Sequence, residues 1–177
     1  QDAKELASTL NKASEDLQSI RERADHSIDM QINELNTALK QVQQLNSKIT
    51  AARSSGGDPL SLEDKRQTLI DQINTIVPIK QIARDHGQVA LYTERGAILL
   101  DGPAAEVEFT PTGTISAELS VAGGHLSGLT VNGFAINTEN LRGPLSGGSL
   151  SAQFHIRDDL AVEAQALVGQ KPTCRRQ

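Results

Sequence analysis

The chain is 177 residues long, enough for one ordinary domain or two small ones, and only 2% of its residues are aromatic. Aromatics this scarce disfavour a deep ligand pocket or a surface that stacks bases or sugars. A net charge of −5 disfavours binding to nucleic acid, which needs a clustered basic face, and no run approaches the roughly 18 apolar residues of a membrane span.

Residues 1–52 contain no Gly or Pro, and their apolar side chains recur every three or four positions. This spacing predicts one amphipathic helix roughly 75 Å long, which needs partner helices from the same chain or from another subunit. The polar face mixes signs, as in Arg21, Glu22, Arg23 and Asp25, and is interpreted as solvated or as forming the rim of a contact. The stripe expected to pack on a helix or on a subunit comprises Leu10, Leu17, Ile20, Ile28, Ile32, Leu35, Leu39, Val42, Leu45 and Ile49.

Gly56, Gly57 and Pro59 predict the end of this helix and a reversal of the chain. Helical spacing resumes over residues 62–76 and stops before Pro78, so we expect a second, antiparallel helix. Ser61, three residues before Asp64, gives a weak capping-box signal at its start.

The region from 78 to 148 has a composition typical of a small all-β module, because eleven of the 14 glycines lie between residues 83 and 149. Short alternating or β-branched runs predict strands at 79–83, 88–93, 97–100, 105–110, 114–121 and 129–136. About 70 residues bury too little surface to be very stable alone, so we expect this module to dock on the helices. Gly123-Gly124 and Gly147-Gly148 fit turns and lack the pattern of a phosphate-binding loop.

A helix capped by Ser149 is expected to return to the rod over residues 149–170. Residues 171–177 include Pro172, which would stop that helix, and the lone Cys174, and we interpret them as an aberrant tail. The expected fold is therefore α+β: a long antiparallel helical rod, with residues 1–77 as its N-terminal arm, and an inserted small all-β domain at 78–148.

Groups that could support catalysis or bind metal are scattered. The four histidines, His26, His86, His125 and His155, fall in four different predicted elements without paired ligand spacing. His155 lies near Asp158, but charges on a helix surface explain this pairing more simply than acid–base catalysis. We expect no catalytic site, no metal and no cofactor, and an enzyme acting on the cell wall lacks the carboxylate pair it would need.

Asp64 and Arg66 are too close in sequence to face each other on one helix, so each is expected to meet another element. Asp158 is the candidate partner for Arg66, and Asp64, Arg66, Arg157 and Asp158 together are interpreted as a clamp between the two helical arms. A solvated helix face and a contact with a neighbouring subunit are the alternatives.

Several stretches resemble a known family. They are Leu35-Asn36 with residues 45–49, the Asp64-x-Arg66 helix at 62–73, residues 89–93 and 96–102, and residues 147–158 with Arg157-Asp158. This order is similar to that of the flagellar hook-associated family of the hook–filament junction, a relative of flagellin, over most of residues 30–167. Gln67, where the family usually has Asp, and the residues after Leu167 depart from that pattern.

The resemblance implies a non-enzymatic, extracellular subunit of the bacterial flagellum, exported through the flagellar type III route without a cleaved signal peptide. Because the chain begins at Gln1, without an initiator Met, we expect a central fragment of a longer protein. The implied partners are further copies of itself, the hook protein, the neighbouring junction protein and an export chaperone that binds a terminal segment missing here. The alternatives are another flagellin-like axial protein, and a surface β module on a coiled-coil stalk that acts as an adhesin or binding protein.

Overall fold

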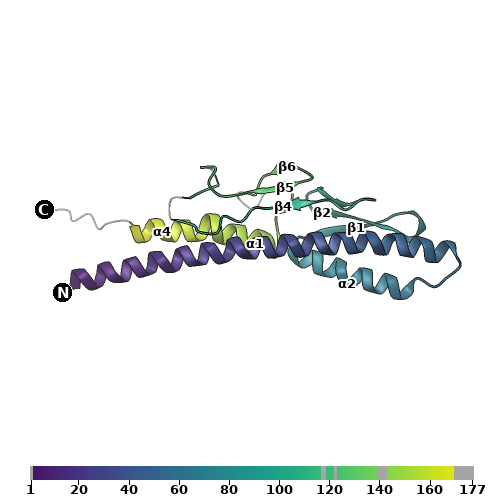
Figure 1. The fold of residues 1–177 in the computed structure, drawn as a ribbon, viewed down its shortest axis with the longest axis horizontal. Helices are drawn as coiled ribbons and strands as arrows, with labels where there is room; N and C mark the ends of the chain where they lie inside the picture. The colour runs from purple at the N-terminus through teal and green to yellow at the C-terminus, as the bar shows by residue number, and fades with distance from the viewer. Residues whose placement is uncertain (1, 117–118, 122, 139–142, 170–177) are drawn as a thin grey trace.

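A computed structural model describes residues 2–116, 119–121, 123–138 and 143–169. One long helix, α1 (Asp2–Ser54), runs along almost the whole of this elongated molecule (Figure 1). Helix α2 (Leu60–Ile76) packs beside its C-terminal half. The returning segment packs on the part of α1 that precedes the contact with α2, through α3 (Gly148–His155), the π-helical turn η3 (Ile156–Leu160) and α4 (Ala161–Gly169). The expected α+β class is confirmed, and the predicted tail at 171–177, with Cys174, lies outside the described residues.

The strands form two small antiparallel sheets on one side of the helices (Figure 1). Sheet A has the order β1-β2-β3, and sheet B has the order β4-β5-β6. A 3₁₀ turn, η1 (Asp85–Gly87), joins the first two strands. The strand bounds are β1 Ile79–Ala83, β2 Val89–Thr93, β3 Ile98–Leu100, β4 Val107–Glu108, β5 Leu129–Val131 and β6 Phe134–Ile136.

Two of the predicted strands differ from what the structure shows. The run at 129–136 is a hairpin, because Asn132 and Gly133 both adopt positive φ and reverse the chain between β5 and β6. The strand expected at 114–121 is wrong for the described part of that run, which carries no strand. Backbone groups there bond to side chains of α1 instead of to a neighbouring strand, as the Ile115 N–H does to Glu22 Oε1 (3.1 Å).

Both expected helix caps are also wrong. Helix α2 begins at Leu60, whose N–H donates to Asp58 Oδ1 (3.0 Å), so Ser61 lies inside the helix. Helix α3 begins at Gly148, and the Ser149 hydroxyl donates to Gln31 Oε1 on α1 (2.7 Å). A Cβ on Gly148 would lie 2.4 Å from the Ile76 carbonyl oxygen, so glycine lets α3 begin directly against the end of α2.

A single hydrophobic cluster joins the helices to both sheets. Leu35, Leu39 and Val42 of α1 are buried together with Ile73 of α2 and Leu91 of β2. The expectation that the β region docks on the helices is therefore confirmed.

Two asparagines on α1 attach the sheets to the rod. Asn36 donates from Nδ2 to the Val107 carbonyl (2.7 Å) and accepts from the Val107 N–H (3.0 Å), so its amide pairs with β4 as a neighbouring strand would. Asn46 makes the same pair of bonds with Val89 of β2, at 2.8 and 3.2 Å. Because strand backbone is costly to bury unpaired, these amides fix which strand residue lies over which turn of α1.

We predict that Asn36→Ala lowers the free energy of unfolding by about 2 kcal/mol and the thermal midpoint by roughly 4–8 °C, because both backbone groups of buried Val107 lose a partner. Asn33→Ala is the matched control, since the Asn33 side chain is exposed on the same helix and bonds only to the Asp29 carbonyl one turn earlier. Circular dichroism melting checks both variants. Equal midpoints for the two would contradict the role of Asn36.

An exposed ion pair ties β1 to the end of β3. Arg84 donates to both oxygens of Asp101 (3.0 and 2.7 Å), and the Tyr92 hydroxyl donates to Asp101 Oδ2 (2.5 Å). The hydrogen bonds from Arg84 and Tyr92 lower the pKa of Asp101 from 3.8 to about 2. The same carboxylate raises the pKa of Tyr92.

A lowered carboxyl pKa contributes stability that is fully present above the unfolded value and is lost as pH falls through the folded value. We therefore predict that the difference in thermal midpoint between the parent chain and Asp101→Asn is constant above about pH 5, shrinks as the pH falls and is lost below about pH 2. Melting curves across this range measure it, with Asp16→Asn, exposed on α1, as the control. A difference that grows on acidification would have the wrong sign.

Candidate functional site

The residues of the predicted stripe divide into two groups. Ile28, Ile32, Leu35, Leu39, Val42 and Ile49 are buried within this chain. In the isolated chain they serve helix packing and are not available to a second subunit. Leu10, Leu17, Ile20 and Leu45 keep part of their surface exposed.

The four clamp residues do not meet at one place. Arg66 of α2 donates from Nη1 to Asn46 Oδ1 (2.9 Å) and to the Gly87 carbonyl (2.7 Å), and burial lowers its pKa. Arg66 therefore holds η1 and the Asn46 amide together near the hairpin of α1 and α2. The expected Arg66–Asp158 pair is wrong, because Asp158 lies in η3 and binds its neighbour Arg157, while Asp64 is exposed.

Arg157 is the centre of a second clamp. Its side chain is fully buried, and its guanidinium donates from Nη1 to Asp25 Oδ1 (2.7 Å) and from Nε to Asp158 Oδ1 (2.7 Å). The guanidinium carbon lies 5.6 Å from the Phe109 ring centroid and 5.0 Å from that of Phe154. Two carboxylates and two aromatic faces thus compensate this charge for its loss of water.

Arg21 on α1 is also fully buried, and it donates hydrogen bonds to backbone carbonyl oxygens. It donates from Nε to the Arg157 carbonyl (2.9 Å), from Nη1 to the Ser116 carbonyl (3.0 Å) and from Nη2 to the Leu119 carbonyl (2.6 Å). Burial lowers the pKa of Arg21, and nearby Arg157 lowers it further while Asp158 opposes the effect. Four bonds from Arg21, Glu22 and Asp25 thus hold Thr112, Ile115, Ser116 and Leu119 along the helix.

The name junction cluster denotes Arg21, Glu22, Asp25, Arg157 and Asp158. Asp25 also accepts from the Thr112 N–H (2.7 Å), so the cluster joins α1, η3 and the segment after β4. The interpretation of Arg21 and Asp25 as solvated is wrong, since they are 0% and 1% exposed. Their spacing in the sequence indicates burial, because both residues continue the row of Ile28, Ile32 and Leu35 at steps of three and four.

A π-helical turn places Arg157 in the junction cluster. The Ala161 N–H donates to the Ile156 carbonyl five residues earlier, as in a widened helical turn. The carbonyl of Arg157 points to Arg21, so this turn presents both its side chain and its backbone oxygen to α1. The arrangement fixes three segments against each other and buries the charges of Arg21, Asp25 and Arg157.

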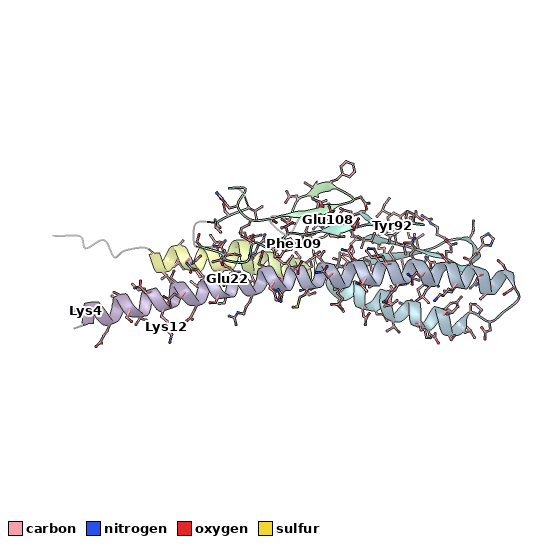
Figure 2. All side chains as sticks on the ribbon, in the orientation of Figure 1. Lys4, Lys12, Glu22, Tyr92, Glu108 and Phe109 are labelled. Atoms are coloured by element: carbon pink, nitrogen blue, oxygen red, sulfur yellow. The ribbon has the colours of Figure 1, made fainter. Side chains whose placement is uncertain are left out.

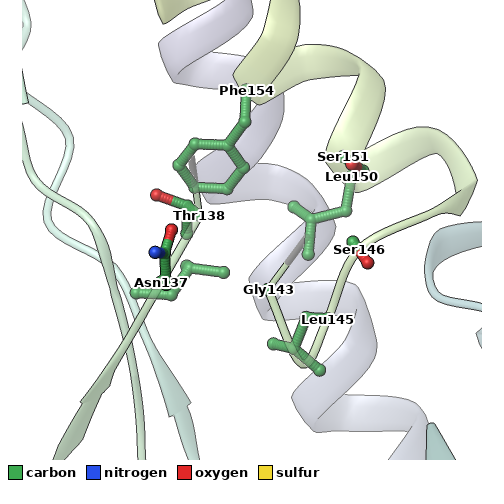
Figure 3. Close-up of a pocket in the computed structure, with 9 residues that line it drawn as sticks. Asn137, Thr138, Gly143, Leu145, Ser146, Leu150, Ser151 and Phe154 are labelled. Atoms are coloured by element: carbon green, nitrogen blue, oxygen red, sulfur yellow. The ribbon is translucent and has the colours of Figure 1, made fainter. Parts of the chain in front are cut away.

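The structure also contains a small cavity between the end of β6 and α3 (Figure 3). Leu129, Leu145, Leu150 and Phe154 line it, and its volume of about 10 Å³ holds at most one water. Within the described ranges, no group of three His, Cys, Asp or Glu side chains is arranged to hold a metal ion. In those same ranges, no helix is long and apolar enough to cross a membrane.

We predict that Asp25→Asn lowers the free energy of unfolding by about 3 kcal/mol, because it leaves the buried charge of Arg157 short of one partner. Asp64→Asn, an exposed carboxylate of the originally expected clamp, is the control and should change stability by less than about 0.5 kcal/mol. Urea unfolding measures both. An Asp25→Asn variant as stable as the control would show that the pair contributes nothing.

Comparisons with known proteins agree with this architecture. The curated flagellar hook-associated protein 1 of Bacillus subtilis is 28% identical over 96 residues, which cover 54% of this chain and 19% of that protein. The solved structure of the flagellar hook junction protein FlgK from Burkholderia pseudomallei superposes with a TM-score of 0.66 at 17% identity, over 85% of this chain and 26% of that one. The chain thus spans about a fifth to a quarter of the length of these proteins.

The family match covers far more of this chain. Residues 1–171 match the family described as the flagellar hook-associated protein FlgK helical domain. They include the rod helices, both sheets and the junction cluster. The chain therefore belongs to the FlgK helical domain family of flagellar hook-associated proteins.

Proposed function

We propose that this chain is the helical domain of a structural, non-enzymatic subunit of the bacterial flagellum, polymerised at the hook–filament junction. The family match over residues 1–171 carries this proposal. The stiff rod supports it, because a 53-residue helix braced along most of its length by other elements suits a part that bears load within an assembly. The buried charges of Arg21, Asp25 and Arg157 in the junction cluster favour a mechanical role over a chemical one.

Further parts of the proposal concern the whole protein. The parent protein is exported through the flagellar route without a cleaved signal peptide, lies outside the cell and contacts the hook protein and the neighbouring junction protein. An export chaperone binds a segment outside this chain. Residues 1–77 and 149–170 form the rod of the domain, residues 78–148 its β insertion, and Leu10 and Leu17 belong to the contact with further helices.

The test is an in-frame deletion of the codons for residues 1–171 in the organism that encodes the chain. If the domain builds the junction, hooks remain but filaments do not attach, and swimming is lost. Electron microscopy of hooks and a motility assay measure both effects. Normal numbers of attached filaments in the deletion strain would overturn the proposal.

Point variants test whether the folded domain itself is needed for filament attachment, because they leave the rest of the protein in place. Asp25→Asn disturbs the junction cluster and is expected to reduce the number of attached filaments, whereas the exposed Asp64→Asn leaves it unchanged. Deletion cells that swim normally yet adhere poorly to surfaces would instead favour the adhesin alternative.

A further inference from the structure

The tip of sheet B carries an exposed aromatic ring. Phe134 is the first residue of β6, directly after the Asn132-Gly133 turn, and is 77% exposed. The rings of Phe109 and Phe154 pack edge to face instead, with centroids 6.0 Å apart. A ring held in water on a tight hairpin loses little freedom on binding, which makes it a good anchor for a contact. The name hairpin knob denotes Phe134 with its turn.

The surroundings of the hairpin knob are acidic. Residues 96–141 contain no Lys or Arg, and Glu106 and Glu108 lie on and beside β4, the strand that pairs with the hairpin. Both glutamates are exposed, and Glu108 lies on the side of α1 away from α2 (Figure 2). A partner for this tip therefore needs an apolar recess with basic side chains.

A groove of that description lies between α1 and α2. Its volume is about 410 Å³, within the range of about 300–1,000 Å³ that suits compact ligands, so an aromatic ring fits. The partly buried Leu45 and Leu69 supply its apolar surface, and its charged residues, Lys48 and Lys65, are both basic. The name helix groove denotes the set Gln41, Gln44, Leu45, Lys48, Lys65, Thr68, Leu69 and Gln72.

The hairpin knob and the helix groove lie on opposite faces of α1. Asn36 holds β4 of sheet B, and Leu45 follows nine residues later, roughly 180° around the helix. A copy of the chain therefore cannot fill its own groove. A contact between two such different faces is head-to-tail, and its repetition gives rings or helical series.

We propose that the hairpin knob of one copy docks in the helix groove of a second copy, with Phe134 against Leu45 and Leu69 and with Glu106 and Glu108 facing Lys48 and Lys65. The proposal rests on the proposed function and names a contact through which its subunits repeat. Charge complementarity and the fit of one ring to the groove select a second copy as the occupant.

The experiment is a cross-linking assay between two forms of the full chain, each carrying Cys174→Ser. One form carries Ala135→Cys beside Phe134, and the other carries Thr68→Cys in the helix groove. A short bis-maleimide should join the two forms into a mixed dimer. Adding Phe134→Ser to the first form should lower the yield at least about tenfold, as expected for loss of an anchor residue.

Matched variants guard against indirect effects. Ile98→Ser removes an apolar residue that is 52% exposed on β3 and should leave the yield unchanged. Lys65→Glu should lower the yield, and combining it with Glu106→Lys on the opposite form should restore it. Circular dichroism of each variant checks folding, which is expected to persist because all these side chains are exposed.

Three results would overturn the proposal. One is a yield no higher than that from Lys12→Cys, on the exposed N-terminal part of α1. Another is equal sensitivity to Phe134→Ser and Ile98→Ser. The third is a stronger link to Ala152→Cys, in the separate hollow near Pro78, which would place the hairpin knob elsewhere.

Failure of this contact is distinguishable from failure of the proposed function. If deleting residues 1–171 detaches filaments while Phe134→Ser cells keep them and no cross-link forms, only the contact is wrong. If the deletion leaves filaments attached, the junction role fails, whatever the cross-link shows.

Discussion

The structure depends on one row of side chains along α1. Steps of three and four lead from Arg21 through Asp25 and Ile28 to Asn46 and Ile49, and every position of the row is buried. α1 is not stable on its own, because without partners its apolar face would be exposed to water. α2, both sheets and the returning segment are held at successive positions along this row. Its polar members, Arg21, Asp25 and Asn46, determine where the returning segment, α2 and sheet A lie, while the neighbouring Asn36 holds sheet B.

The apolar and polar members of the row make different contributions. Ile28, Leu35 and Leu39 supply non-directional burial, which tolerates sliding of one element along another. Arg21, Asp25 and Asn46 bond to particular backbone groups, and such bonds are lost on a shift of one residue. Buried charges cost much of what they contribute, so their effect here is more on register than on stability. This division explains how segments with little regular secondary structure keep a defined place on the helix.

The sequence predicted the elements whose signals are local. The spacing of apolar residues predicted α1, and the segment from Gly56 to Pro59 predicted the reversal of the chain. The strand expected at 114–121 failed over its described residues, because alternation could not reveal that Arg21 and Glu22 would bond to their backbone groups. The pairing of Arg66 failed because partners distant in sequence follow from the way the elements pack, and the burial of Arg21 and Asp25 was missed because charge was taken as a sign of exposure. Extending the three-and-four spacing of the buried row to polar residues would have predicted that Arg21 and Asp25 are buried.

The distribution of basic residues also determines how the chain meets a protease that cuts after Lys and Arg. Arg21, Arg66 and Arg157 are 0–8% exposed, so their peptide bonds become substrates only when the rod opens. Lys80, Arg84 and Arg95 are exposed around sheet A, whereas residues 96–141 offer no cleavage point at all. Cleavage at the exposed sites of sheet A would therefore leave residues 96–141, the acidic β segment, within one long fragment. Cleavage after Arg157 would report opening of the helical junction itself.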